Sequence, residues 1–231
     1  MILIAKNKIV LADGKVLHLS ELSGKLEDFF SLSTSVWNNS YCQKRMKIPG
    51  SICEECYAYN SWRKKTMIKP LTENMNILSS KLYEVEDFPE IPHKVLRLES
   101  HGEISNLTHA RNYIRLAKRN PDCVFTIWTK NYGILNQAIQ LEGKPENMIT
   151  GCSSLFKNTP YKPRYSWVDF VFTVFDADYV KENDTTINCP RKCKTCMKCY
   201  TLENFKNKTE PLYIREILKS DASKVKVEGD E

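Results

Sequence analysis

Strand and helix patterns alternate between residues 71 and 175, and this alternation most constrains the fold of the 231-residue chain. CVFTIWT, at 123–129, is a short run rich in apolar and aromatic residues, as buried strands are. Strands that alternate with helices predict a parallel sheet built from right-handed βαβ units. The predicted strands are 94–100, 123–129, 147–153 and 167–175, and the predicted helices are 71–84, Leu107 to Ala117, and 132–141.

The two ends of the chain complete the expected fold. MILIAKNKIVLADGKVLHL predicts a hairpin that turns at Ala12-Asp13-Gly14, and KLEDFFSLST predicts a further strand. We expect an α/β fold over residues 1–200: one partial (βα) TIM-like barrel domain with a parallel sheet, an N-terminal β-hairpin and a C-terminal cysteine-rich segment. In 201–231, PLYIREILKS predicts a short helix and DASKVKVEGDE a disordered tail.

Charge and hydropathy describe an ordinary globular chain. The formal net charge is +6, and 42% hydrophobic with 27% charged residues is typical of a soluble domain. Lysine and arginine are spread along the chain, which favours a solvated surface over a binding stripe. No apolar run has the length of a bilayer span, and MILIAKNKIV lacks the pattern of a cleaved signal peptide. These features predict a cytoplasmic protein without membrane contact.

Seven of the nine cysteines fall into two groups. In a reducing compartment a disulfide framework is not expected, so clustered thiols indicate metal ligands. Cys123 and Cys152 adjoin predicted strands and are expected to be buried free thiols. The first group is Cys42, Cys53 and Cys56, in the loop 42–56, and the second is Cys189, Cys193, Cys196 and Cys199, in the segment 189–199.

The spacing within the second group is the most informative motif. CPRKCKTCMKCY separates its cysteines by three, two and two residues, as in ferredoxin runs that wrap the backbone around an iron–sulfur cluster. Zinc is the alternative, because four cysteines can form a tetrahedral knuckle that joins the tail to the sheet. The cations that could offset thiolate charge are Arg191, Lys192, Lys194 and Lys198.

Polar residues follow the predicted strands, where the sites of parallel sheets form. Ser100, His101, Gly102 and Glu103 are the candidate cofactor-binding residues, although a turn, with Glu103 or Asn106 capping the next helix, is an alternative reading. Lys130 fits either the site or the surface. The other residues at strand ends are Thr129, Asn131, Cys152, Ser153, Ser154, Asp176 and Asp178.

Side chains within the strands are expected to have structural roles. Arg97 and Glu99 share one face of their strand and predict an internal ion pair. The predicted core aromatics are Phe125, Trp128, Phe170 and Phe172.

Four ordered motifs carry a resemblance to a known family. FFSLSTSVWNNSYCQKRMKIPGSICEECYA, RLESHGEIS, TIWTKN and INCPRKCKTCMKCY resemble the cysteine-rich phage and prophage proteins of the "gene product eighty-eight" family, over about residues 28–200. This resemblance implies a phage or mobile-element origin, and hence a host cytoplasm. It also implies functional weight for the seven clustered cysteines.

A more distant similarity concerns mechanism. Radical S-adenosylmethionine (SAM) enzymes are βα barrels with a three-cysteine cluster loop after the first strand and a glycine-rich segment after the second. The resemblance implies a 4Fe-4S cluster on Cys42, Cys53 and Cys56 with one iron open to SAM. It also implies that Ser100-His101-Gly102-Glu103 contacts SAM, and that the C-terminal four cysteines hold an auxiliary cluster.

Three functions therefore stay open. The first is an iron–sulfur enzyme of radical SAM-like type that acts on an unknown substrate. The second is an iron–sulfur redox protein that acts on a host partner, and in either case the chain would hold one cluster or two. The alternative is a zinc-stapled, non-catalytic binding module that contacts nucleic acid through its C-terminal cations or binds a host protein.

Overall fold

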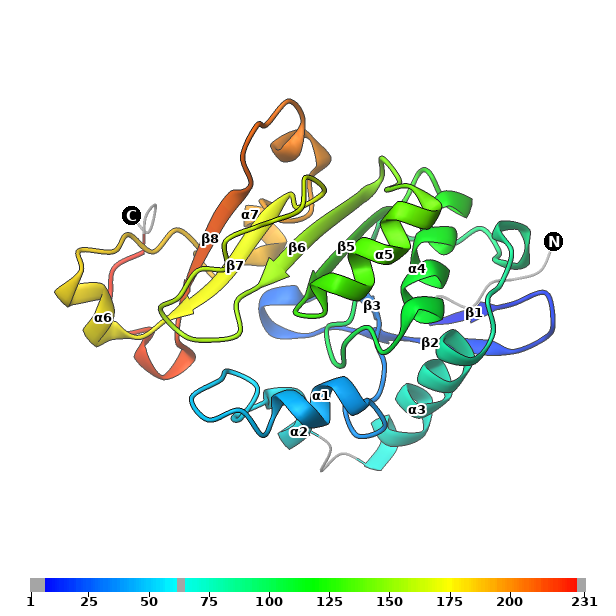
Figure 1. The fold of residues 1–231 in the computed structure, drawn as a ribbon, viewed down its shortest axis with the longest axis horizontal. Coiled ribbons are helices and arrows are strands. Elements are labelled where there is room, and N and C mark those ends of the chain that lie inside the picture. The colour runs from blue at the N-terminus through cyan, green and yellow to red at the C-terminus, as the bar shows by residue number, and fades with distance from the viewer. Residues whose placement is uncertain (1–6, 62–64, 228–231) are drawn as a thin grey trace.

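The computed structural model describes residues 7–61 and 65–227, in which eight strands form one sheet in chain order (Figure 1). The strands are β1 (Lys8–Val10), β2 (Val16–Glu21), β3 (Phe30–Leu32), β4 (Val95–Leu98), β5 (Val124–Thr129), β6 (Met148–Ser153), β7 (Phe170–Phe175) and β8 (Leu212–Ile217). The helices are α1 (Ser40–Arg45), α2 (Tyr57–Ser61), α3 (Lys65–Ser80), α4 (Leu107–Arg119), α5 (Tyr132–Glu142), α6 (Ala177–Glu182) and α7 (Cys193–Cys196), with short 3-10 turns that include η1 (Gly24–Leu26), η3 (Leu202–Phe205) and η4 (Lys219–Asp221).

The N-terminal hairpin is confirmed. β1 pairs antiparallel with β2, and the chain reverses through Ala12, Asp13 and Gly14, where Gly14 has a positive φ of 80°. The strand predicted from KLEDFFSLST is confirmed as β3, which adds antiparallel to β2 and parallel to β4. The hairpin therefore extends the edge at which the parallel sheet begins.

Strands β3 to β8 are all parallel, and each pairs with the next one in the sequence. Because right-handed crossovers that keep moving in one direction place their helices on one face, α3, α4 and α5 lie side by side (Figure 1). The predicted α/β class and parallel sheet are confirmed. The sheet is not closed into a barrel, since within the described strands β8 pairs with β7 alone.

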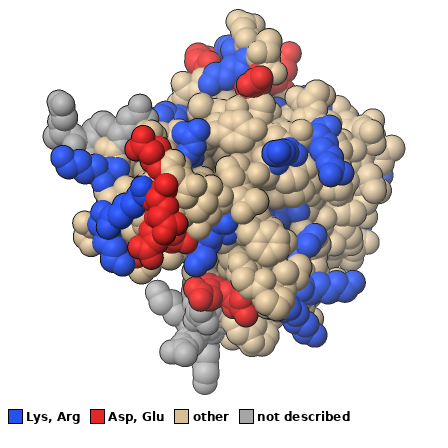
Figure 2. Space-filling model, turned by 60° about the vertical axis from the view of Figure 1, so that its left-hand side comes forward, with Lys and Arg blue, Asp and Glu red and all other residues tan. Residues whose placement is uncertain are grey.

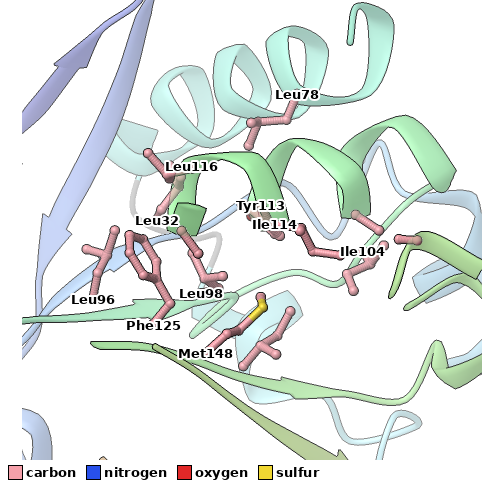
Figure 3. Packing of buried hydrophobic residues seen from close by; sticks show 14 of the residues in the cluster. Leu32, Leu78, Leu96, Leu98, Ile104, Tyr113, Ile114, Leu116, Phe125 and Met148 are labelled. Atoms are coloured by element: carbon pink, nitrogen blue, oxygen red, sulfur yellow. The ribbon is translucent and has the colours of Figure 1, made fainter. Parts of the chain in front are cut away.

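The main core lies between the sheet and these helices (Figure 3). Leu96, Leu98 and Phe125 point from the strands toward Ile114 of α4 and Leu78 of α3. Alternate strand residues supply this helix face of the sheet, as the period of two in a strand requires. Cys123 and Cys152 are buried free thiols, as predicted, and among the predicted core aromatics Phe125 and Phe170 are fully buried, whereas Trp128 and Phe172 are partly buried.

Helix α3 differs from the predicted range of 71–84. It begins at Lys65 and ends at Ser80, with Pro70 inside it. A proline costs a helix one backbone hydrogen bond, and Leu71, Met75 and Leu78 are all buried, so the packing of this face outweighs that loss. The prediction that Pro70 precedes the helix was wrong.

The prediction of a helix in PLYIREILKS was also wrong. Residues 212–217 form β8, which pairs in parallel with all six residues of β7. Ile214 and Ile217 are buried in different apolar clusters, so this segment is stabilised by partners that are distant in sequence.

The expected disordered tail is contradicted over residues 221–227. Val225 and Val227 pack against a small cluster that contains Phe175 and Ile217, and Asp221 accepts a hydrogen bond from the backbone of Ala177. The rest of the predicted tail, 228–231, lies outside the described residues. Among the described helices, none combines the length and apolar character needed to cross a bilayer.

Candidate functional site

The first cysteine group lies in the loop between β3 and α3, beyond the C-terminal ends of the strands, where Figure 1 shows α1 and α2. Asn39 caps α1 by accepting hydrogen bonds from the backbone N–H groups of Tyr41 and Cys42. The Asn39 amide also donates to the carbonyl of Glu103 at 2.6 Å. Asn39, the residue that caps the helix carrying Cys42, is thereby fixed to the loop that follows β4.

The three thiols of this group are half-buried and close enough to influence one another. Burial raises the pKa of Cys42 well above its usual range, and the carboxylates of Glu103 and Glu99 add to the shift. Burial also raises the pKa of Cys53, although the Lys130 ammonium opposes it. Lys130 is therefore a residue of the site rather than of the open surface. The raised pKa values of Cys42 and Cys53 favour the protonated thiol over the thiolate at these two residues.

Gly102 is required where the loop after β4 passes the end of β3. Its φ is +89°, a conformation that residues with a side chain rarely adopt. A Cβ placed on it would lie 2.5 Å from the carbonyl oxygen of Thr34 and 2.6 Å from a carboxylate oxygen of Glu99. The predicted glycine therefore serves the close packing of two loops, whatever ligand binds nearby.

Glu103 is buried, and its carboxylate accepts three hydrogen bonds. They come from the Thr129 hydroxyl at 2.6 Å, the Lys130 N–H at 2.7 Å and the Ile104 N–H at 2.9 Å. Burial raises the pKa of Glu103, although these donors act to lower it. The carboxylate thus ties the loop after β4 to the end of β5. Asn106 is the N-cap of α4, as one reading of the sequence predicted.

Ser100 and His101 lie over the end of β3. The Ser100 hydroxyl contacts that of Ser33 at 2.9 Å, and the Ser33 hydroxyl accepts from the His101 N–H at 3.2 Å. The His101 ring packs edge-on against Tyr57, one residue beyond Cys56. Burial lowers the pKa of His101, and the neighbouring Arg97 guanidinium lowers it further. The four candidate cofactor-binding residues therefore do lie beside the first cysteine group.

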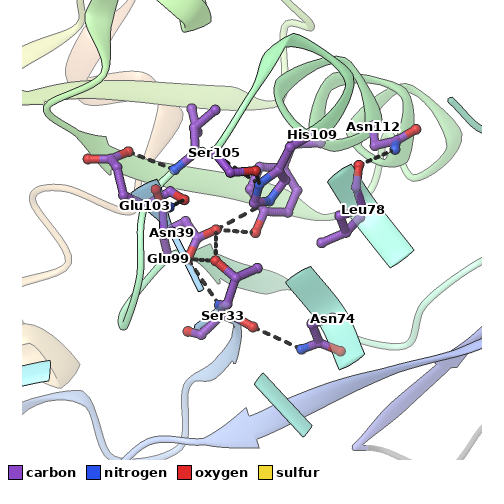
Figure 4. A network of polar contacts seen from close by, with 12 residues as sticks. Ser33, Asn39, Asn74, Leu78, Glu99, Glu103, Ser105, His109 and Asn112 are labelled. Atoms are coloured by element: carbon purple, nitrogen blue, oxygen red, sulfur yellow. Dashed lines mark hydrogen bonds and ion pairs between the residues drawn. The ribbon is translucent and has the colours of Figure 1, made fainter. Parts of the chain in front are cut away.

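The predicted ion pair between Arg97 and Glu99 is wrong. Glu99 has a positive φ of 54°, which turns its side chain out of the strand alternation. Its carboxylate accepts from the Thr34 hydroxyl and from the Tyr113 hydroxyl at 2.7 Å, and it lies 3.3 Å from Nε2 of His109 (Figure 4). Glu99 therefore joins a buried network on the helix side of the sheet, away from Arg97.

His109 is the buried polar residue that the sequence analysis missed. The Ser105 N–H donates to its Nδ1 at 3.2 Å, so that nitrogen is an acceptor and the ring proton is on Nε2, facing Glu99. The Nε2–Glu99 contact does not meet hydrogen-bond geometry, so Nε2 is a buried polar atom without a hydrogen-bond partner among the described residues. The sequence does carry a signal that His109 is buried: it is four residues from Tyr113, on the face of α4 that also carries Ala110.

The second cysteine group lies on the other face of the sheet. This inner face carries Arg97, Thr126, Trp128, Ile149 and Phe170. Cys189 and Cys199 pack in the apolar cluster that contains Ile149 and Phe170. The second group therefore packs against the sheet, whereas the first lies in the loop beyond the ends of the strands.

The backbone of the second group is sharply turned. Arg191 and Met197 have positive φ values of 57° and 50°, and the short helix α7 between them carries Cys193 and Cys196. Left-handed backbone at non-glycine residues costs roughly 1–2 kcal/mol each, so the surrounding contacts must hold this conformation. The N–H of Cys189 supplies one contact by donating to the carbonyl of Arg215 in β8.

The thiols of the second group are also half-buried and influence one another. Burial raises the pKa of Cys189 to about 11, with a further contribution from Glu216. Burial likewise raises the pKa of Cys199, and its three partner thiols add to the shift. Burial also raises the pKa of Cys193. Thiols with raised pKa values would release protons on binding a metal.

Two of the four predicted cations of this segment are engaged by carboxylates. Arg191 pairs with Glu216, and Lys194 pairs with Asp28. Lys25 of η1 also reaches Glu216 of β8, at 2.7 Å. The Lys25 and Lys194 pairs connect the segment between β2 and β3 to β8 and α7. On the face drawn in Figure 2, basic side chains occur in separate groups, some beside acidic side chains and others among neutral ones.

Arg97 lies between the two groups. Its guanidinium stacks 4.2 Å from the Trp128 ring and donates to the Tyr200 hydroxyl at 3.3 Å. Burial acts to lower the pKa of Arg97, but Tyr200, Tyr57 and Cys193 outweigh it and the pKa is raised. Tyr57 follows the first cysteine group and Cys193 belongs to the second, so both approach this one side chain.

The positions of the thiols bear on the predicted metal binding. All nine cysteines are free thiols. Within residues 7–61 and 65–227, no three His, Cys, Asp or Glu side chains already converge to hold a metal ion. The donor chemistry nevertheless fits a thiophilic metal, because seven unpaired thiols gather in two groups and buried donor groups lie beside the second.

The remaining residues at strand ends have structural roles. Asp176 caps α6 by accepting from the Tyr179 N–H, and Ser154 bonds to Thr173. The Thr129 hydroxyl donates to Glu103 and accepts from the Asn131 N–H.

Comparisons with models of protein families, with curated proteins and with solved structures found no match to this chain.

Proposed function

We propose that this chain is an iron–sulfur protein in which the two cysteine groups hold one or two 4Fe-4S clusters. The observation that carries the proposal is the gathering of seven free, half-buried thiols into two groups beside one parallel sheet. Ligands would be Cys42, Cys53 and Cys56 in the first group, and Cys189, Cys193, Cys196 and Cys199 in the second. The short steps of the second group suit a cubane cluster.

The proposed architecture is a partial TIM-like barrel. Two features support it: the uninterrupted order of β3 to β8, and the contacts that η1, just before the first parallel strand, makes with both β8 and α7. In such a barrel the second cysteine group would occupy the opening and the first would lie at the mouth.

The proposed reaction class is radical SAM-like, on a substrate of unknown chemistry, in a phage-type protein of a host cytoplasm. Its support is the position of the three-cysteine loop after β3, the first parallel strand, and of Gly102-Glu103 after β4. The first cluster would supply electrons for reductive cleavage of SAM.

The chain's own residues would bind and orient. Asn39 and Glu103 hold the cysteine loop against the ends of β4 and β5, and Gly102 lets the two loops pack closely. The Glu103 carboxylate is used internally, so a SAM contact in this segment would fall to backbone groups or to His101.

Metal analysis after anaerobic purification tests the proposal. We expect brown protein that contains iron and acid-labile sulfide, with loss of part of both in Cys42→Ser. Cys123→Ser is the matched control, since Cys123 is a buried thiol outside both groups and its replacement should leave the iron content unchanged. Colourless wild-type protein without sulfide would refute the proposal.

Addition of SAM separates the enzyme from a simple redox protein. Formation of 5′-deoxyadenosine by the reduced protein is the result expected for a radical SAM-like enzyme. An EPR signal of the reduced cluster that SAM leaves unchanged would instead favour electron transfer to a host partner.

A zinc-stapled module is the second candidate function. The observation in its favour is that Lys194 of the second group pairs with Asp28, and Lys25–Glu216 lies close by, so that the segment between β2 and β3 is joined to the C-terminal part of the chain, as a structural staple would join it. Stoichiometric zinc without sulfide is its expected signature. Nucleic-acid binding through this segment has less support, because Arg191 and Lys194 are already paired with carboxylates; a steep loss of affinity with salt would restore it.

A further inference from the structure

Two polar atoms on the inner face of the sheet are buried and lack hydrogen-bond partners within the described residues. They are Nε of Arg97 and the hydroxyl oxygen of Thr126. A buried donor without a partner costs free energy, so unpaired donors are rare in folded proteins. Two in the same place indicate that something absent from the protein chain accepts from them.

The two residues are direct neighbours. Arg97 of β4 and Thr126 of β5 are paired in register, and both belong to the inner face, since Leu96, Leu98, Phe125 and Ile127 occupy the helix face. Thr126 is fully buried, so bulk water does not serve as its partner.

The second cysteine group covers this pair. Tyr200, adjacent to Cys199, accepts from the Arg97 guanidinium and stacks near Trp128 of β5. Arg97 is also near enough to Cys193 and Cys199 to lower the pKa of each thiol, against the larger effect of burial. Cys189 and Cys199 pack in the cluster that contains Trp128 and Ile149, and Ile149 pairs in register with Thr126. The orphaned donors thus lie on the part of the inner face against which the second cysteine group packs.

We propose that Arg97 Nε–H and the Thr126 hydroxyl donate hydrogen bonds to sulfur atoms of the cluster held by the four C-terminal cysteines. This inference rests on the proposed function and deepens it by naming the residues that set the reduction potential. Reduction adds one negative charge to the cluster, so hydrogen bonds and a nearby cation stabilise the reduced state more than the oxidised state. Arg97 and Thr126 are positioning residues that raise the potential.

Thr126→Val tests the inference with little change of shape. Replacing the donor should lower the reduced-to-oxidised ratio at a given potential about tenfold, a shift of about 59 mV to lower potential for a one-electron couple. An EPR-monitored redox titration of the full-length, anaerobically purified protein measures it. Comparison with Cys53→Ser identifies which signal comes from the first cysteine group.

Thr150→Val is the matched control. Thr150 is also fully buried, in the adjacent strand β6, but its hydroxyl donates to the carbonyl of Trp167 at 2.6 Å on the helix side. This variant should lower the melting temperature and leave the potential unchanged. Arg97→Gln should shift the potential in the same direction as Thr126→Val, while Arg97→Lys should restore part of the shift by keeping the charge.

Melting of the holoprotein supplies an independent readout. If the Thr126 hydroxyl binds sulfur, Thr126→Val lowers the melting temperature; if it is a true orphan, the valine raises it. An unchanged potential with full iron and sulfide content, or a raised melting temperature, would overturn the inference alone. A wild-type protein without iron and sulfide would overturn the proposed function instead.

Discussion

The two cysteine groups use opposite means of support. The first lies on a loop at the ends of the strands, fixed by Asn39 and bordered by Lys130, with the exposed Tyr57 beside it. The second lies against the inner face, in an apolar cluster with Phe170 and beside ion pairs that join the segment between β2 and β3 to β8 and α7. The first group is therefore held at the end of the strands, beside an exposed side chain. The second is built into the packing of the sheet.

Loss of a ligand should therefore have different consequences in the two groups. Thiolate metal sites that organise a fold contribute roughly 10 kcal/mol of apparent folding free energy, and losing one of four ligands removes a large share. We expect Cys189→Ser to lose its metal and to melt far below the wild type. Cys53→Ser should lose metal with a much smaller change in melting temperature, as measured by calorimetry and metal analysis. Equal melting temperatures for the two variants would end the comparison.

Gly102→Ala should disrupt the first group without changing a cysteine. The new methyl would approach Thr34 and Glu99 in a backbone conformation that disfavours alanine, a combined cost of roughly 3 kcal/mol. For a chain of this length we expect the melting temperature to fall by about 6–12 °C. Gly102→Ala should lose only that part of the bound iron that Cys53→Ser also loses.

Gly143→Ala is the control for Gly102→Ala. Gly143 also has a positive φ, 74°, but has open space around its Cβ position. Its φ of 74° and ψ of 147° lie in a region that residues other than glycine rarely adopt, so its substitution should cost roughly 1–3 kcal/mol from backbone conformation alone and leave the iron content unchanged. If both alanine variants lose iron to the same extent, close packing at Gly102 is not what supports the rim.

Lys25→Met should have the smallest effect, because it removes one half-buried ion pair. The Lys25 ammonium lies 2.7 Å and 2.9 Å from the two carboxylate oxygens of Glu216 and joins η1 to β8. We expect a loss of about 1 kcal/mol in the free energy of unfolding by urea. Lys206→Met, which breaks the exposed pair with Glu203, should leave that free energy unchanged. A silent Lys25→Met would show that the edges are held by apolar contacts such as Phe29 with Tyr200.

Local signals predicted the elements that neighbours in sequence determine. The turn at Gly14, the apolar run of β5, and the start of α4 after its cap Asn106 could all be read from the chain. The strand β8 could not, because its stability comes from pairing with β7 across a long crossover. Its apolar residues alone suit a helix as well.

The site was predictable in composition but not in geometry. The predicted order of the strands correctly indicated that His101 and Glu103 lie beside the first cysteine group. Nothing in the sequence indicates the positive φ of Glu99, because a positive φ can be predicted only at glycine and at the few polar residues that commonly adopt it. That backbone conformation separates Glu99 from Arg97 and leaves the arginine free to approach the second group.

The position of the second cysteine group between β7 and β8 has a consequence for biosynthesis. Because Phe170 pairs with Leu212 across this crossover, the last parallel strand leaves the ribosome only after all four cysteines have done so. Bringing the ends of a long crossover together is slow, and a cluster bound by the emerging segment would shorten the effective loop. Cofactor supply during translation would then control how quickly the sheet is completed, and iron-starved cells would accumulate chains whose final strand has not docked.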